Sequence, residues 1–390
     1  MNTPTEGDQG LVERCAALVP ALRERAEAAE AGRRLPPETF DMLSEAGVFR
    51  MTAPKLFGGQ EASFETQCEA LAEIARGCAS ASWVSTILSA MSWLVATFPD
   101  EAQAEIFDSK DPRISGVFTP TGSVVPRNGG YVLSGRWGYN TGGDGSNWTV
   151  VNAVFEDDDG PGAPVCTLVK SSELKRLDDW HASGMSATGS STVLAEDVFI
   201  PAHRAQSLPA MIEASYPARH NADNPYYNYP LASVLAVNAA GTPVGIARGA
   251  FELFSEHLHG RPITFTTYTD RAEAPVTHLE IGAAALTIDS ADAHMRLACA
   301  ELDDHLGERL TVEGRVKARA HVSAATGLAR DAVDRLFYSS GAAAIQSHVA
   351  IQRHQRDIQA LANHAIMHPK TTTELYGRIL CGLEPNTVLF

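Results

Sequence analysis

The part of this sequence best suited to proton chemistry lies near its C-terminal end. There the pairs Gln352-Arg353 and Arg356-Asp357 are followed, seven residues after the aspartate, by His364. The stretch Ile358–Pro369 contains no acidic residue, so the group that can exchange a proton there is the imidazole of His364. An imidazole has an ordinary pKa of about 6.5 and can act as a base at neutral pH. His364 is therefore a candidate base, although a lone histidine can equally be a structural helix residue.

Composition and motif content argue against several classes of function. The chain carries 31 basic and 47 acidic side chains, a formal net charge of −16, whereas nucleic-acid binding requires a basic face. Its six cysteines are scattered and form no Cys-x-x-Cys pair, so we expect no metal site and no redox pair. The chain also lacks a Gly-x-Gly-x-x-Gly motif after a strand and a Walker-type loop, so it offers no obvious nicotinamide site of its own.

The sequence shows no targeting or membrane segment. Residues 1–10 are polar and acidic, without the basic and apolar regions of a signal peptide. No run approaches the ~18 apolar residues that a membrane span needs. We therefore expect a cytoplasmic protein that binds neither a membrane nor a nucleic acid.

Hydrophobic periodicity divides the chain into helices, then strands, then helices again. Apolar residues recur at helical spacing over the first ~110 residues. Helical patterns return at about Ala232 and continue to Arg378. Between them, β-rich patterns predict strands at Tyr131–Ser134, Trp148–Phe155, Val165–Val169 and Thr192–Leu194 with Val198–Ile200. We therefore expect a mainly α protein with a central β domain, divided into residues 1–112, 113–210 and 211–390.

Four groups of motifs, spread over most of the chain, resemble those of the acyl-CoA dehydrogenase superfamily. In order they are Leu35–Phe40 with Pro54–Gly59, Gly129–Gly142, Ser183–Ser191 with Glu196–Pro201, and Gln352–Asp357. The segment Glu196–Pro201 is quite specific to that superfamily. The resemblance implies the fold of that superfamily, with an N-terminal helical domain, a β-barrel or β-sandwich, and a C-terminal four-helix bundle.

Within this superfamily the chain resembles the two-component, or group D, flavin-dependent aromatic monooxygenases. Dehydrogenases need a glutamate base, and neither the stretch after Arg356-Asp357 nor the interval between Asp223 and Glu252 contains an acidic residue. His364 stands where the aromatic hydroxylases place a catalytic histidine. The resemblance implies reduced FAD or FMN from a separate NAD(P)H-flavin reductase, O2 as co-substrate, a small aromatic substrate and a homotetramer.

The resemblance also assigns roles to individual residues. Thr141 is expected to hold the N5 proton of a flavin C4a-hydroperoxide, and His364 to take a proton from a phenol or an indole N–H. The residues expected to bind the flavin are Phe118, Thr119, Tyr139, Asn140, Thr141, Gly142, Ser190, Ser191 and, from a neighbouring subunit, Arg261. The expected substrate walls are Trp83, Met91, Trp93, Phe118 and Trp180, together with His364.

Each assignment has a plainer alternative. Thr141 can be an ordinary turn residue, Ser190 and Ser191 strand-edge hydroxyls, Arg261 a solvated helix-end residue, and each tryptophan part of the core. An N-oxygenase acting on an amine such as an amino sugar, an acyl-CoA dehydrogenase and a protein that has lost catalysis remain open as functions.

The helix near residue 90 narrows the expected substrate. Relatives that hydroxylate simple phenols often place a histidine there, whereas this chain has Leu88–Trp93 without an imidazole. Met91 and Trp93 suit a bulkier and more apolar ring system. We therefore expect a polycyclic or indole-bearing natural product.

Overall fold

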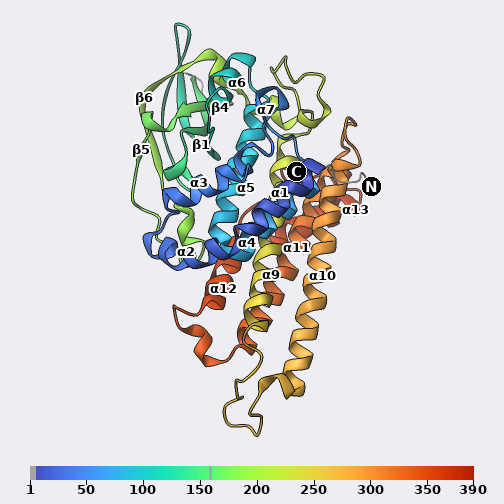
Figure 1. Cartoon of the computed structure of the whole chain (residues 1–390). Coiled ribbons are helices and arrows are strands. Elements are labelled where there is room, and N and C mark those ends of the chain that lie inside the picture. The colour runs from blue at the N-terminus through green and yellow to red at the C-terminus, as the bar shows by residue number, and fades with distance from the viewer. Residues whose placement is uncertain (1–5, 158–159) are drawn as a thin grey trace.

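The computed structural model describes residues 6–157 and 160–390 and begins with a group of helices (Figure 1). Residues 1–5 of the leading segment considered above lie outside the described residues. The helices of this first group are α1 (Glu6–Ala17), α2 (Val19–Gly32), α3 (Pro37–Glu45), α4 (Phe64–Gly77), α5 (Ala79–Val95) and α6 (Asp100–Phe107).

Helices α4 and α5 are the innermost of this group. The Ser63 hydroxyl caps α4 by accepting a hydrogen bond from the backbone N–H of Thr66. The extended backbone of Cys78 ends α4 and turns the chain into α5. Every residue of α5 except Ile87 is buried, because this helix is covered by other elements on all sides.

A seven-stranded mixed sheet follows. Its strands are β1 (Ile114–Arg127), β2 (Gly130–Trp137), β3 (Trp148–Asp157), β4 (Gly160–Lys170), β5 (Lys175–Arg176), β6 (Val193–Pro201) and β7 (Ala205–Ser207). They lie in the order β5-β6-β2-β1-β3-β4-β7. Strands β1 and β3 pair in parallel and the other neighbours pair antiparallel.

The second helical part of the chain forms a bundle. Its elements are α7 (Leu208–Ile212), α8 (Leu231–Asn238), α9 (Gly241–Ser255), α10 (Pro275–Asp303), α11 (Val312–Ser339), α12 (Ala350–Leu361) and α13 (Pro369–Leu380). Helices α10 and α11 are the longest of the described chain, with 29 and 28 residues, and they pack along each other.

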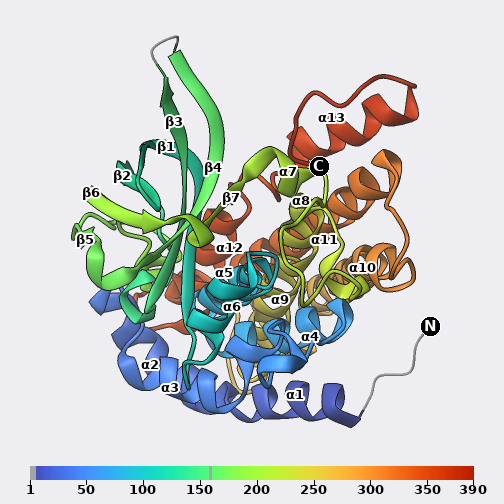
Figure 2. The same ribbon diagram turned by 90° about the horizontal axis from the view of Figure 1, so that it is seen from above.

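The sheet lies on one side of the molecule and the bundle on the other, with α5 between them (Figures 1 and 2). The predicted order of helices, sheet and helices is confirmed. The predicted boundary at residues 112/113 falls between α6 and β1, whereas the one at 210/211 would cut α7. The exact domain limits therefore stay a prediction.

One segment of the bundle resembles a membrane span by length and composition. It is Leu231–Ser255, which comprises α8 and α9. Within the structure, however, 89% of its most apolar window is buried. This burial is what the central helix of a bundle requires.

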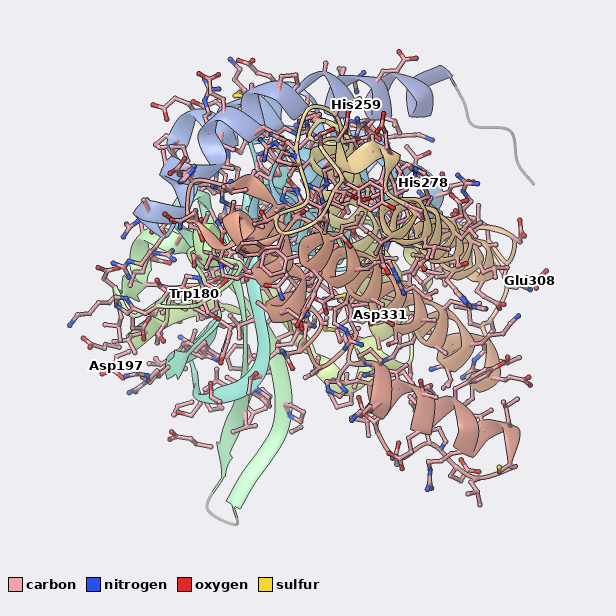
Figure 3. All side chains as sticks on the ribbon, turned by 90° about the horizontal axis from the view of Figure 1, so that it is seen from below. Trp180, Asp197, His259, His278, Glu308 and Asp331 are labelled. Atoms are coloured by element: carbon pink, nitrogen blue, oxygen red, sulfur yellow. The ribbon has the colours of Figure 1, made fainter. Side chains whose placement is uncertain are left out.

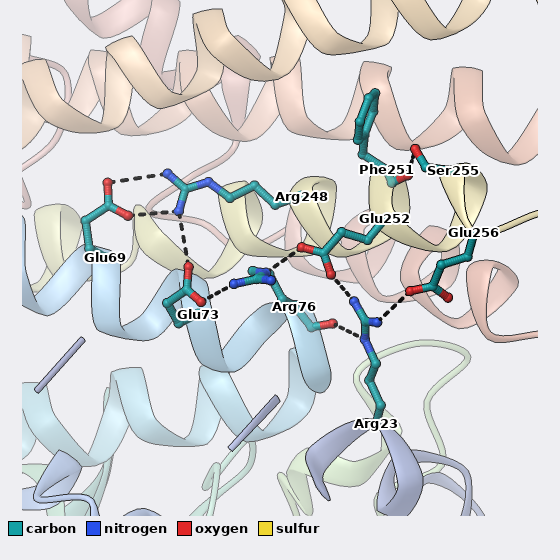
Figure 4. Close-up of polar contacts among 9 residues, drawn as sticks. All are labelled: Arg23, Glu69, Glu73, Arg76, Arg248, Phe251, Glu252, Ser255 and Glu256. Atoms are coloured by element: carbon teal, nitrogen blue, oxygen red, sulfur yellow. Dashed lines mark hydrogen bonds and ion pairs between the residues drawn. The ribbon is translucent and has the colours of Figure 1, made fainter. Parts of the chain in front are cut away.

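Ion pairs fasten the N-terminal helices to the bundle along α9 (Figure 4). The Arg76 Nε donates to the Glu252 Oε1 at 2.6 Å, and Arg23 of α2 contacts the same carboxylate. The Arg248 Nη1 donates to the Glu69 Oε2 at 2.8 Å. Because a partly exposed pair stabilises a fold by only about 0.2–1 kcal/mol, the main effect of this network is to fix α4 against α9.

Candidate active site

Two loops beside α5 form the first part of the site, one after β2 and the other before β6. The Asn140 N–H donates to the Ser191 carbonyl oxygen at 3.1 Å. The Gly142 N–H donates to the Thr188 carbonyl oxygen at 2.9 Å. These two backbone bonds hold the loops side by side.

Gly142 seats the first of these loops on α5. Its φ of +69° lies in the left-handed region, which glycine adopts without steric cost. A Cβ at this position would come within 2.8 Å of the Val84 Cγ1 and 2.9 Å of the Leu88 Cδ1. Backbone conformation and space therefore both require glycine here.

Three buried hydroxyl groups connect the two loops. The Thr141 Oγ1 lies 2.7 Å from the Ser190 Oγ, which lies 2.7 Å from the Thr188 Oγ1. The Thr188 hydroxyl in turn donates to the Met185 carbonyl oxygen at 2.8 Å. The sequence-predicted residues Thr141 and Ser190 are thus in direct contact.

Helix α12 holds the second loop in place. The Asp357 Oδ1 accepts a hydrogen bond from the Met185 N–H at 2.5 Å. The Arg356 Nη1 donates to the Ser183 carbonyl oxygen at 2.7 Å. A Cβ on Gly184 would lie 2.1 Å from the Arg356 carbonyl oxygen, so the loop packs directly on the helix backbone.

The charged groups of α12 have structural partners. Arg353 and Arg356 both pair with Glu30 of α2, at 2.9 Å and 2.5 Å. Burial tends to raise the pKa of Glu30, but the hydrogen bonds from Arg356 and Arg353 outweigh it and lower that pKa. Burial raises the pKa of Asp357 to about 7. The C-terminal motif therefore serves to join α12 to α2 and to the Met185 loop.

His364 lies in the segment between α12 and α13 and contacts α5. Its ring centroid is 5.1 Å from that of Trp83, in an edge-to-face arrangement with an interplanar angle of 69°. The residue as a whole is exposed, but the protein around its imidazole group desolvates that group, and the charge of Arg319 adds to this, lowering its pKa to about 4. The lowered pKa keeps the imidazole neutral at physiological pH.

Further aromatic and apolar side chains lie on neighbouring elements. Met91 of α5 covers Gly116 of β1, where a Cβ would lie 2.3 Å from the Met91 Sδ. Phe118 is half-buried two residues further along β1 and packs against the buried cluster that contains Met91. Trp180 packs edge-on against the exposed Tyr139, with ring centroids 5.7 Å apart.

Three predicted site residues lie apart from these contacts. Trp93 is fully buried, and its indole N–H donates to the Tyr226 carbonyl oxygen at 2.9 Å, as in a core residue. Thr119 is exposed on β1. Figure 3 shows Trp180 beside the strands and His259 in the loop after α9; Arg261 follows two residues later in the sequence and is exposed.

The loops offer hydrogen-bonding groups that fit a flavin ring edge. Asn140 is fully buried, and neither its Oδ1 nor its Nδ2 has a hydrogen-bond partner among the described residues. A buried amide without partners is costly, so this loop has unmet hydrogen-bonding capacity beside the Thr141 hydroxyl. No group of three metal-ligating side chains occurs in the described parts of the chain.

Sequence reasoning missed Thr188, Met185 and Asp357 as parts of the site. Thr188 and Met185 fall inside the motif Ser183–Ser191, in which only the two serines were singled out. Asp357 closes the motif Gln352–Asp357, to which the sequence alone assigns no contact with the site. The sequence signal was the threonine two residues before Ser190, but its partner is visible only once the loop is folded.

Comparison with known proteins assigns the chain to a family. Residues 11–107 match the family model of the acyl-CoA dehydrogenase N-terminal domain, and residues 237–369 match that of the acyl-CoA dehydrogenase C-terminal domain. The chain is 33% identical to the flavin-dependent monooxygenase oxygenase subunit HsaA of Rhodococcus jostii, over 94% of this chain and 97% of that protein.

Two further relatives agree with this assignment. The chain is 31% identical to the oxygenase component of an FADH2-dependent resorcinol hydroxylase of Rhizobium sp., over 96% of this chain and 95% of the relative. The structure of XiaF from Streptomyces sp. in complex with FADH2 and glycerol superposes with a TM-score of 0.91. It is 30% identical and covers 98% of this chain and 97% of its own.

Proposed function

We propose a function from the premise that this chain belongs to the acyl-CoA dehydrogenase family and, within it, to the flavin-dependent monooxygenase oxygenase components. It uses reduced flavin and O2, and the flavin is reduced by a separate protein. The proposal concerns the roles of its own residues, its substrate class and its assembly. We expect the protein and its reductase to work in the cytoplasm.

The reduced flavin, when bound, supplies the activation of O2 for transfer of one oxygen atom to the substrate. The residues proposed to hold its ring edge are Thr141, Asn140 and Ser190. Their loops are fixed against each other and against α5 and α12, so the hydroxyl and amide groups are positioned before any flavin binds. Such preorganisation lowers the cost of binding.

The observation that carries the proposed catalytic role is the contact of His364 with Trp83. It places a neutral imidazole on an aromatic wall, 5.1 Å between ring centroids. A base that removes the proton of a ring hydroxyl or ring N–H makes an aromatic carbon a better nucleophile toward oxygen. General bases contribute about 10²–10⁴-fold to a rate. We assign that role to His364.

The proposed substrate is an aromatic compound with a fused or heteroaromatic ring system. The name of the related resorcinol hydroxylase states a phenolic substrate, which supports aromatic hydroxylation. Here the proposed walls, Trp83, Met91 and Phe118, are apolar, and α5 carries no charged side chain. A large ring system can cover such walls, as is usual for small-molecule sites.

The same features weigh against the alternatives. A dehydrogenase needs a free carboxylate, yet Asp357 accepts the Met185 N–H and Glu252 pairs with Arg76. An amine N-oxygenase needs acidic side chains around a cationic substrate. The proposed base His364 instead lies against the aromatic ring of Trp83, which carries no negative charge. Aromatic hydroxylation is the function that the arrangement supports best.

A homotetramer is the proposed assembly. The apolar side chains Val276, Leu279, Leu286 and Leu297 are between 50% and 72% exposed along α10. A second copy of the chain would cover this stripe. In such an assembly Arg261, which stands on the loop between α9 and α10, would reach the flavin of a neighbouring subunit. Light scattering of the wild type and of Leu286→Asp tests this, and a wild-type monomer would contradict it.

The proposed function is tested by turnover of an aromatic panel with a general NAD(P)H-flavin reductase. The panel contains simple phenols, indoles, fused-ring phenols and amino sugars, and mass spectrometry detects the gain of one oxygen atom. We expect hydroxylation of the fused-ring or indole compounds. Oxygenation of the amino sugars alone would overturn the proposed function. Oxygenation of the simple phenols alone would overturn the proposed substrate class.

A further inference from the structure

The hydroxyl chain Thr141–Ser190–Thr188 has only one hydrogen-bonding direction that satisfies all its contacts. Three hydroxyl protons serve three contacts, of which the last ends on the Met185 carbonyl oxygen. A carbonyl oxygen cannot donate, so Thr188 donates to it. Ser190 must then donate to Thr188, and Thr141 to Ser190.

This direction leaves the Thr141 oxygen with lone pairs and no free proton. Its own proton is directed toward Ser190, 2.7 Å away. Toward a ligand, Thr141 can therefore accept a hydrogen bond but cannot donate one without reversing the chain. The Met185 carbonyl oxygen fixes this direction because it can only accept, and it also accepts the Thr188 N–H at 3.1 Å and the Trp180 indole N–H at 3.3 Å.

We propose that this hydroxyl chain selects the reduced flavin over the oxidised flavin, with Thr188 and Ser190 as specificity-determining residues that act through Thr141. The inference rests on the proposed contact of Thr141 with the flavin N5. In reduced flavin N5 carries a proton and donates, whereas in oxidised flavin N5 is only an acceptor. The acceptor-only Thr141 therefore matches the reduced form.

Binding of oxidised flavin would require the chain to reverse. Thr141 would donate to N5, Ser190 to Thr141, and Thr188 to Ser190, and the Thr188 hydroxyl would no longer donate to the Met185 carbonyl. With flavin bound, the observed direction makes four hydrogen bonds, counting the one between Thr141 and N5, whereas the reversed direction makes three. One hydrogen bond corresponds to about a two- to tenfold change in an equilibrium constant. The hydroxyl chain keeps its position because Asp357 of α12 accepts the Met185 N–H and so holds Met185 in place.

The test is the ratio of the dissociation constants of oxidised and reduced flavin, measured anaerobically by fluorescence or calorimetry with FMN and FAD. In Thr188→Val the hydroxyl is removed, so Ser190 can donate to Thr141 and Thr141 can donate to N5. We expect the ratio to fall by about two- to tenfold. The change should come from tighter binding of oxidised flavin, with reduced-flavin binding unchanged.

Two variants serve as controls. Thr188→Ser keeps the hydroxyl and should restore the wild-type ratio. Thr167→Val removes a buried hydroxyl that donates to the Val151 carbonyl at 2.9 Å in the sheet, and should leave the ratio unchanged. Ser190→Ala is a second test variant: it also frees the Thr141 proton, but it removes a hydroxyl proposed to hold the flavin ring edge, so only the ratio of the two dissociation constants is compared. In this ratio the double variant should match either single variant, because residues of one network do not act additively.

The outcomes separate this inference from the proposed function. A wild type that binds neither flavin state, or hydroxylates nothing, would count against the proposed function. A wild type that prefers reduced flavin and hydroxylates aromatics, with an unchanged ratio in Thr188→Val, overturns the hydroxyl-chain inference alone. Changes in the ratio that add up in the double variant would also overturn it, since they would show that Thr188 and Ser190 do not act as one hydroxyl chain.

Discussion

The two sides of the candidate site differ in how far they are organised before any ligand binds. On the proposed flavin side, Thr141, Ser190 and Thr188 form a buried chain of hydroxyls that ends on Met185, which Asp357 of α12 holds in place. On the substrate side, His364 is exposed and rests against Trp83, and its Nδ1 has only a long contact of 3.4 Å with the Ile366 N–H.

This difference indicates a division of labour. A cofactor keeps the same shape in every turnover, so a fixed set of hydrogen-bonding groups suits it. A base that removes a substrate proton must keep its lone pair free and must adapt to the ring that arrives. The flavin side is therefore expected to respond to substitutions in cofactor affinity and stability, and the substrate side in the rate of hydroxylation.

The largest expected effect is on the substrate side. His364→Asn should lower the rate of aromatic hydroxylation by about 10²–10⁴-fold, because the proposed base is lost. Reduced-flavin affinity should stay within about twofold, since less than one hydrogen bond is at stake. Product formation by chromatography and flavin titration measure the two effects.

His368→Asn is the matched control for this substitution. His368 is the residue before α13, where asparagine is a good helix cap. The control should keep nearly all of the hydroxylation rate. Equal loss in both variants would show that the segment, and not the His364 imidazole, matters.

Asp357, which accepts the Met185 N–H, should affect the stability of the folded protein. Asp357→Ala leaves the buried Met185 N–H without its acceptor, which costs about 1–3 kcal/mol of unfolding free energy. Asp357→Asn keeps an acceptor oxygen and should cost clearly less, because burial already favours the uncharged carboxyl. Denaturant unfolding of both variants decides the matter, and equal stability of the alanine variant and the wild type would refute the anchoring role.

Thr141 itself should have a smaller effect. Thr141→Val removes the proposed acceptor for the flavin, so reduced-flavin affinity should fall by up to about tenfold. Thr167→Val, distant in the sheet, controls for the loss of a buried hydroxyl. If Thr141→Val bound reduced flavin as tightly as the control, the proposed contact would be wrong.

The pH dependence should be the smallest effect near neutrality. The lowered pKa of His364, about 4, means that the base is already deprotonated at pH 6. The contribution of His364 to the hydroxylation rate should rise as the pH increases through about 4. It should then stay level through the ordinary histidine range near 6.5. An acidic limb centred near 6.5 that disappears in His364→Asn would contradict this.

Much of the fold could be predicted from the sequence, because its periodicities and motifs are local. The order of helices, sheet and helices follows from alternating and helical patterns that each element carries by itself. The same is true of the turn at Gly142, where glycine follows Asn140 and Thr141. These features need no knowledge of distant partners.

The site was harder to predict because it depends on contacts between distant segments. Trp83 and Trp93 look alike in sequence, yet one contacts His364 and the other donates to Tyr226 in the core. The hydrogen bond between Asp357 and Met185 connects residues that are 172 positions apart in the sequence. Packing of α12 on the loop decides such contacts, and no local pattern encodes it.

The most direct test of the central claim is incorporation of labelled oxygen into an aromatic product. Wild-type protein, reduced flavin and the best substrate of the panel are mixed with ¹⁸O2 in unlabelled water, and the product is analysed by mass spectrometry. A flavin-dependent monooxygenase places one ¹⁸O atom in each product molecule. Product without the label, or a flavin that an acyl-CoA reduces while no aromatic compound is oxygenated, would contradict the account.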